Sequence, residues 1–103
     1  MLRTIILVPE AVADVADAYE WYEGKDNGLG ENFLNCLDTA YASISEHPTH
    51  YPVRFDSFRR VLLDRFPYAI YYEYDDQVIF VHYVFHCSQD IEKVNLRLSI
   101  PKK

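Results

Sequence analysis

The stretch that decides the fold is residues 68–85, which read YAIYYEYDDQVIFVHYVF. Residues 68–74 and 78–85 are dense in the β-branched and aromatic side chains that favour β-strands. Asp75-Asp76-Gln77, between them, is typical of a hairpin turn. The second run is apolar on nearly both sides, as a central strand of a sheet is. The stretch therefore predicts two antiparallel strands at the centre of a sheet.

Shorter segments extend this sheet. Residues 60–66 alternate in character before Pro67 interrupts them, which indicates another strand. Residues 51–55 are expected at an edge, because Pro52 cannot donate a ladder hydrogen bond. Residues 90–98 predict a last short element, which covers part of the sheet and for which Asp90 is a suitable N-cap.

The first half of the chain is mostly helical in its periodicity. Residues 4–8 form a β-branched run that Pro9 ends. An amphipathic helix is expected from Glu10 to a C-cap at Gly24, and a second over residues 31–46. The apolar stripe of the first helix comprises Val12, Val15, Tyr19 and Tyr22, and its solvated acidic face comprises Glu10, Asp14 and Asp17.

The order of these elements predicts one α+β domain over residues 1–103. It consists of an N-terminal strand, a helical hairpin packed on one face of an antiparallel sheet, and a short C-terminal element. The first strand leads directly into a helix, so it cannot pair through a tight hairpin. We therefore expect it to join the sheet after the helices, beside a late strand.

Charge is distributed unevenly along the chain. The net charge is −6, which argues against a general nucleic-acid binder and against direct DNA binding by the protein alone, because phosphate is repelled at long range. Residues 1–50 hold two basic and nine acidic side chains, a net of −7, whereas residues 51–103 hold eight and seven, a net of +1. No apolar run approaches the length of a membrane span, and no signal peptide or dense cysteine framework is present, so we expect a cytoplasmic protein.

Four arginines fall within twelve residues, at positions 54, 59, 60 and 65. Guanidinium groups bind phosphate and carboxylate bidentately, so these residues are candidates for recognition of an anionic partner. The alternative is that they are solvated and paired with Asp56 and Asp64. On a regular strand Arg60 and Arg65 face opposite sides.

The histidines and cysteines give little support for a catalytic or metal site. His82 and His86 are roughly 13 Å apart on a strand, so they cannot share one ion, and we expect no metal and no cofactor. His86 ends the central strand, either as a polar terminator or as a functional group. Cys87 points away from His86 on a strand, so both cysteines, Cys36 and Cys87, are interpreted as packing residues.

The sequence resembles the RelE/ParE toxins, the plasmid-stabilisation proteins of type II toxin–antitoxin pairs, over nearly its whole length. The most specific part is Arg65-Phe66-Pro67-Tyr68 with the downstream Tyr71-Tyr72. The first half carries Trp21-Tyr22 and Gly28-Leu29-Gly30, and the second half carries Arg59-Arg60-Val61-Leu62-Leu63 and ends at His86. The family's fold is a helical hairpin on an antiparallel sheet.

The resemblance implies a small bacterial toxin that a cognate antitoxin neutralises. RelE-like members cleave mRNA on the ribosome without a metal, whereas ParE-like members bind and poison DNA gyrase. For a RelE-like nuclease the catalytic candidates are Arg59, Arg60, Arg65 and His86. For target or antitoxin binding the candidates are Arg54, Arg59, Arg60, Arg65, Tyr68 and Arg97. A Tyr-rich surface would also suit a homodimer.

Two departures favour the ParE-like, non-enzymatic branch. Gln89 stands where the family often has Arg, and the tail offers Arg97, Lys102 and Lys103 but no Tyr. The net charge of −6 is also unlike a protein that must approach ribosomal phosphate. The alternatives that stay open are an mRNA interferase and an interaction domain that has lost its toxicity.

Overall fold

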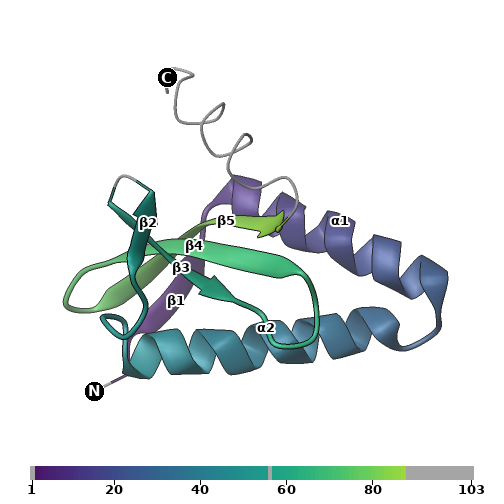
Figure 1. The fold of residues 1–103 in the computed structure, drawn as a ribbon, viewed down its shortest axis with the longest axis horizontal. Helices are drawn as coiled ribbons and strands as arrows, with labels where there is room; N and C mark the ends of the chain where they lie inside the picture. The colour runs from purple at the N-terminus through teal and green to yellow at the C-terminus, as the bar shows by residue number, and fades with distance from the viewer. Residues whose placement is uncertain (1, 56, 88–103) are drawn as a thin grey trace.

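The computed structural model describes residues 2–55 and 57–87 (Figure 1). Its elements, in chain order, are β1 (Thr4–Leu7), α1 (Pro9–Lys25), α2 (Leu29–Glu46), β2 (Val53–Phe55), β3 (Phe58–Leu62), β4 (Tyr68–Tyr74) and β5 (Val78–His86). The α+β class, the leading strand and the helical hairpin are thus confirmed. The element expected over residues 90–98, and Arg97 within it, lie outside the described residues.

The five strands form a mixed sheet in the order β1-β5-β4-β3-β2. β1 does lie beside a late strand, but it runs parallel to β5, from Thr4 opposite Val78 to Leu7 opposite Val81. The wholly antiparallel sheet of the prediction is therefore corrected at this one pairing. A parallel pair needs a long crossover connection, and the two helices between β1 and the remaining strands provide it.

The central hairpin forms as predicted between β4 and β5. Its turn is held by the Asp75 carboxylate, whose Oδ1 accepts the main-chain N–H groups of Gln77 and Val78 at 2.8 Å each. These two bonds lower the pKa of Asp75 below its ordinary value.

The turn between the helices is tight. Gly28 takes the left-handed conformation, with φ of 88°, and stands at the N-cap of α2. Gly24, expected at the C-cap of the first helix, lies inside α1, which ends at a cap on Asp26. The Glu23 carboxylate accepts the N–H groups of Gly28 and Gly30, which satisfies two free donors at the start of α2.

Both helices cover the same face of the sheet (Figure 1). Phe33, Leu37 and Ile44 of α2 and Val81 of β5 are at most 1% exposed in this core. The buried residues of α1 are Ala11 and Ala18, with Val15 and Tyr22 packed beside them. Val12, expected in the apolar stripe, is 54% exposed, because the stripe runs through residues 11, 15, 18 and 22 at helical spacing.

A β-bulge changes which residues of β5 face the helices. The register between β4 and β5 shifts between Tyr71 and Tyr72, so that Tyr71 pairs with Tyr83 and Tyr72 with Val81. Val81 therefore faces the helices, whereas Tyr83 packs in a separate cluster on the opposite face of the sheet. On a regular strand Val81 and Tyr83 would share one face, because side chains alternate with a period of two. The extra residue at the bulge, His82, places them on opposite faces instead.

Candidate functional site

The two neighbouring arginines of β3 lie on opposite faces of the sheet. Arg59 lies opposite Tyr72 on the helix side, and its Nη1 donates to the main-chain oxygen of Tyr51 at 2.6 Å. Its guanidinium carbon also lies 5.7 Å from the centre of the Tyr74 ring. Arg60 lies opposite Tyr71 on the other face and is half-buried. Arg59 thus ties β3 to the segment that leads into β2, through its bond to Tyr51. Because Arg59 and Arg60 lie on opposite faces, they do not form one charged surface.

The other two candidate arginines are exposed. Arg54 stands on β2, and Arg65 stands on the loop between β3 and β4. Within residues 2–55 and 57–87, Arg65 makes no ion pair with a carboxylate, and this includes the expected pair with Asp64. The arginine region of the sequence is therefore divided among two sheet faces, an edge strand and a loop.

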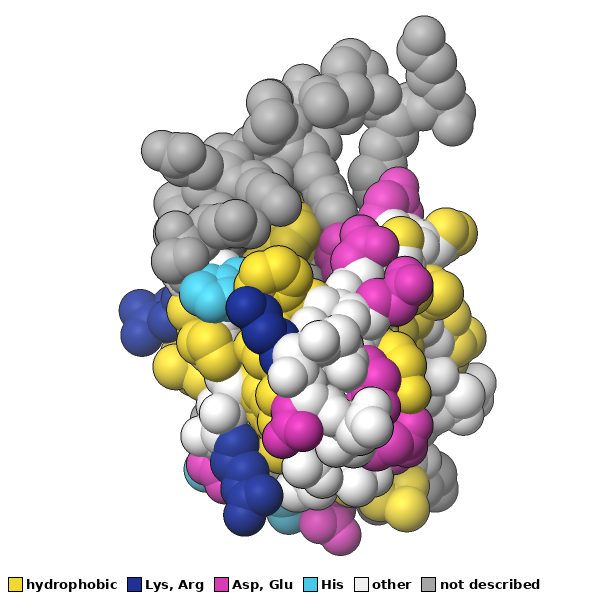
Figure 2. Space-filling model, turned by 90° about the vertical axis from the view of Figure 1, so that its right-hand side faces the viewer, with side chains coloured by type: hydrophobic (Ala, Val, Ile, Leu, Met, Phe, Trp, Pro, Cys, Tyr) yellow, Lys and Arg dark blue, Asp and Glu magenta, His cyan; other side chains and the backbone are white. Residues whose placement is uncertain are grey.

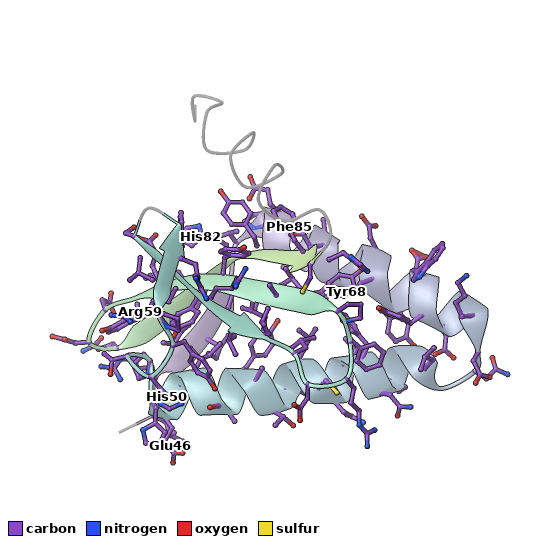
Figure 3. The ribbon with its side chains drawn as sticks, viewed as in Figure 1. Glu46, His50, Arg59, Tyr68, His82 and Phe85 are labelled. Carbon is purple, nitrogen blue, oxygen red and sulfur yellow. The ribbon has the colours of Figure 1, made fainter. Side chains whose placement is uncertain are left out.

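Tyr68 lies at the opposite end of the sheet from Arg59 (Figure 3), and its ring packs against the ring of His86. Their ring centres are 5.3 Å apart, as β4 pairs Tyr68 with His86. Arg59 pairs with Tyr72, four residues further along β4, or about 13 Å at the rise of a strand. The nuclease candidates Arg59 and His86 are therefore not brought together.

The Tyr68–His86 pair lines a groove of about 390 Å³ against α1. The other wall carries Asp14 and Asp17, with Trp21 beside them. Burial raises the pKa of the Tyr68 hydroxyl above its ordinary value, and the neighbouring Tyr22, Asp14 and Asp17 raise it further. We call this groove the acidic groove, because the carboxylates of Asp14 and Asp17 line it.

Asp14 has a structural role that contradicts its expected place on a solvated face. Its Oδ2 accepts the main-chain N–H of Val84 at 3.1 Å. β1 pairs with β5 only as far as Val81, so Val84 lies beyond the end of β1 and its N–H needs another acceptor. The Asp14 carboxylate supplies the acceptor that β1 does not provide at this position, and the bond fixes α1 to β5.

A second groove, of about 520 Å³, runs between α2 and the end of β3. We call it the α2–β3 groove. Its α2 wall is uncharged and polar, and its sheet wall ends in two charged residues, Asp64 and Arg65. The lining comprises Asn32, Asn35, Cys36, Thr39, Ala40, Ser43, Tyr51 and residues 61–65. The polar residues at helical spacing, positions 32, 35, 39 and 43, are the signal in the sequence that could have revealed this wall.

The aromatic residues divide between core and surface. Tyr71 and Tyr72 are fully buried, in the clusters on opposite faces of the sheet. Trp21 is 59% exposed, with the Lys25 Nζ 4.3 Å from its ring centre. Cys87 is also exposed, so its interpretation as a packing residue is wrong, whereas Cys36 is half-buried in the α2–β3 groove.

Charge on the surface follows the uneven distribution along the sequence. Figure 2 shows acidic side chains gathered mainly on one side of the view and Lys and Arg side chains on the other. Among the described residues, no three His, Cys, Asp or Glu side chains lie together as metal ligands. No helix in the described part of the chain has the length and apolar character to cross a membrane.

Similarity to known proteins defines the class of this protein. A solved structure entitled "Chromosomal ParDE TA system from P. aeruginosa" has the same fold, with a TM-score of 0.71 at 12% sequence identity, over 82% of this chain and 96% of that chain. The family model of the ParE toxin of the type II toxin–antitoxin system, parDE, matches residues 5–91. The chain therefore belongs to the ParE toxin family. No curated protein sequence matches it.

Proposed function

We propose that this ParE-family toxin acts in the cytoplasm by binding a target protein, with DNA gyrase as the candidate, and that a cognate antitoxin neutralises it. Membership of the ParE family supports the toxin assignment. In this proposal the pair stabilises the plasmid or chromosomal segment that encodes it. Arg54, Arg65 and Tyr68 are the described candidates that remain available for target or antitoxin contacts, with Arg97 as a further candidate.

The acidic groove is the observation that favours protein binding over RNA cleavage. Metal-free cleavage of RNA needs a base for the 2′-hydroxyl and cations that stabilise the charge on phosphorus. His86 could act as the base, but Asp14 and Asp17 line its groove, and Arg59 lies about 13 Å along the sheet. Carboxylates at this position repel a phosphate rather than stabilise it.

Exposed apolar side chains at both sheet edges support the antitoxin part of the proposal. Leu2 and Ile6 are 69% and 44% exposed at the β1 edge, and Val53 is 49% exposed on β2. Apolar side chains beside an edge strand suit a partner that adds a strand or packs on the edge. A partner that binds only the folded toxin would also raise its melting temperature.

The experiment is induced expression with and without the neighbouring short reading frame, followed by an assay of gyrase supercoiling with the purified toxin. We expect growth arrest that the neighbouring gene product relieves, and loss of supercoiling at toxin concentrations that leave transcripts intact. Transcripts cut on translating ribosomes, with cutting lost in Arg65→Ala, would instead establish the mRNA interferase. Harmless overexpression would establish an interaction domain without toxicity.

A further inference from the structure

β3 has an open edge where β2 ends. The last contact between them is the main-chain N–H of Arg60, which donates to the oxygen of Pro52 at 3.2 Å. Before Pro52 the chain belongs to the turn after α2, where the N–H of His50 donates to the oxygen of His47. β2 therefore covers β3 only as far as Arg60.

The backbone of Leu62 points to this open side. Main-chain groups on an antiparallel strand alternate between its two neighbours. The N–H of Leu63 donates to Tyr68 on the β4 side at 2.9 Å, and that of Arg60 points to the β2 side. Leu62 lies two residues after Arg60 on the same strand. Its N–H and C=O therefore point to the same side as those of Arg60, away from β4. No backbone group in residues 2–55 or 57–87 pairs with them.

The open position on β3 carries an apolar residue, and the charged residues Asp64 and Arg65 follow it in the same wall of the α2–β3 groove. Proteins commonly guard such edges with Pro, Lys or a bulge. Here the exposed residue is Leu62, whose side chain is 56% exposed. The edge also borders the α2–β3 groove, since Leu62 and its neighbours form the sheet wall of that groove.

The other wall has the length and chemistry to accompany a short strand. The twelve residues of α2 from Asn32 to Ser43 span about 16 Å, which equals about five residues of extended chain. Asn32, Asn35 and Thr39 offer amide and hydroxyl groups along this length, and no charge. The exposed guanidinium of Arg65, at the mouth of the groove, makes no ion pair with a described carboxylate and complements an acidic side chain.

We propose that the α2–β3 groove binds an extended segment of a partner protein, which adds as a short strand beside Leu62 and places an acidic side chain on Arg65. The inference rests on the proposed function, in which this toxin works through contacts with other proteins. The bound segment presents uncharged polar side chains to α2, because Asn32, Asn35 and Thr39 can both donate and accept hydrogen bonds to them.

The test uses peptides of about ten residues selected from a random displayed library on the folded protein. The tightest one is then synthesised, and amide hydrogen exchange is followed residue by residue. We expect the Leu62 amide to exchange at least tenfold more slowly with the peptide bound. The amides of Arg60 and Leu63 already donate within the protein, so they serve as internal controls.

Variants locate the binding site. Leu62→Pro removes the outward N–H without removing a bond to β4, and Arg65→Glu reverses the charge at the groove mouth. Each should weaken peptide binding at least tenfold, whereas Lys25→Glu, a charge reversal at an exposed residue outside the groove lining, should not. If Leu62→Pro fails to fold, Thr39→Lys fills the groove from the helix wall and should have the same effect.

Failure to recover any binding peptide, or recovery only of peptides that leave Leu62 exchange unchanged, would overturn the inference. Binding that survives both Arg65→Glu and Thr39→Lys would overturn it as well. This assay measures binding alone, so its failure is distinguishable from failure of the proposed function, which is measured by growth arrest and gyrase supercoiling.

Discussion

The buried hydroxyl of Tyr72 gives a prediction in which the cost of one substitution is smaller at alkaline pH than at neutral pH. Tyr72 is fully buried, and its hydroxyl donates to the main-chain oxygen of Pro48 at 2.6 Å. This bond joins β4 to the turn after α2. Tyr72→Phe removes it and leaves a buried carbonyl without its donor.

At neutral pH the loss should be substantial for so small a domain. A buried partner left unsatisfied costs about 1–3 kcal/mol of the free energy of unfolding. Each kcal/mol lowers the melting temperature by about 4–8 °C at this chain length. We expect Tyr74→Phe, a matched change two residues away at a half-buried site, to have a much smaller effect.

At alkaline pH the difference should shrink. Burial raises the pKa of Tyr72 from 10.0 to about 12, against a smaller lowering effect of the Arg59 charge. The hydroxyl therefore stabilises the fold fully below pH 10, and this contribution is lost as the pH rises towards 12, because the unfolded chain releases the proton first. The loss is about 1.4 kcal/mol per pH unit in that window.

The assay is urea unfolding of the wild type and of Tyr72→Phe from pH 8 to pH 11.5. The stability deficit of the variant should be constant below pH 10 and then shrink, since only the wild type has this proton to lose. The other tyrosines are present in both proteins and cancel in the difference. A deficit that stays constant through pH 11.5 would refute the assignment of the raised pKa to the buried Tyr72 hydroxyl.

Further substitutions test how α1 packs against α2 and β5. Gly30→Ala would place a Cβ 2.8 Å from the Tyr19 ring, so it should cost about 1–2 kcal/mol, as overpacking outweighs helix propensity. Gly24→Ala has open space around its Cβ and should stabilise by about 0.5–1 kcal/mol; thermal unfolding that ranks the two alike would contradict this. Asp14→Ala should lower the urea midpoint by the equivalent of about 1–3 kcal/mol through its lost bond to β5, while Asp17→Ala, on an exposed position of the same helix, should change it little.

Much of the candidate site was beyond reach of the sequence because it depends on how elements face one another. The alternation of residues 60–66 indicated a strand, but β3 ends at Leu62, where Leu63 bonds to Tyr68 and the chain turns. Arg65 therefore lies on a loop at the mouth of a groove rather than on a strand face. Asp14 looked like any solvated helix carboxylate, since its acceptor role exists only where β1 stops short of Val84.

The sequence by itself determined the two helices, the central hairpin and the α+β class, because helical and strand periodicity, the prolines and the Asp75 turn act over a few neighbouring residues. Only the tertiary structure decided that β1 runs parallel to β5, that a bulge at His82 reverses the faces of β5, and that Arg59 rather than Arg60 lies on the helix side of the sheet. These features arise from pairing between segments distant in the chain, where burial and backbone hydrogen bonding on both partners select the register.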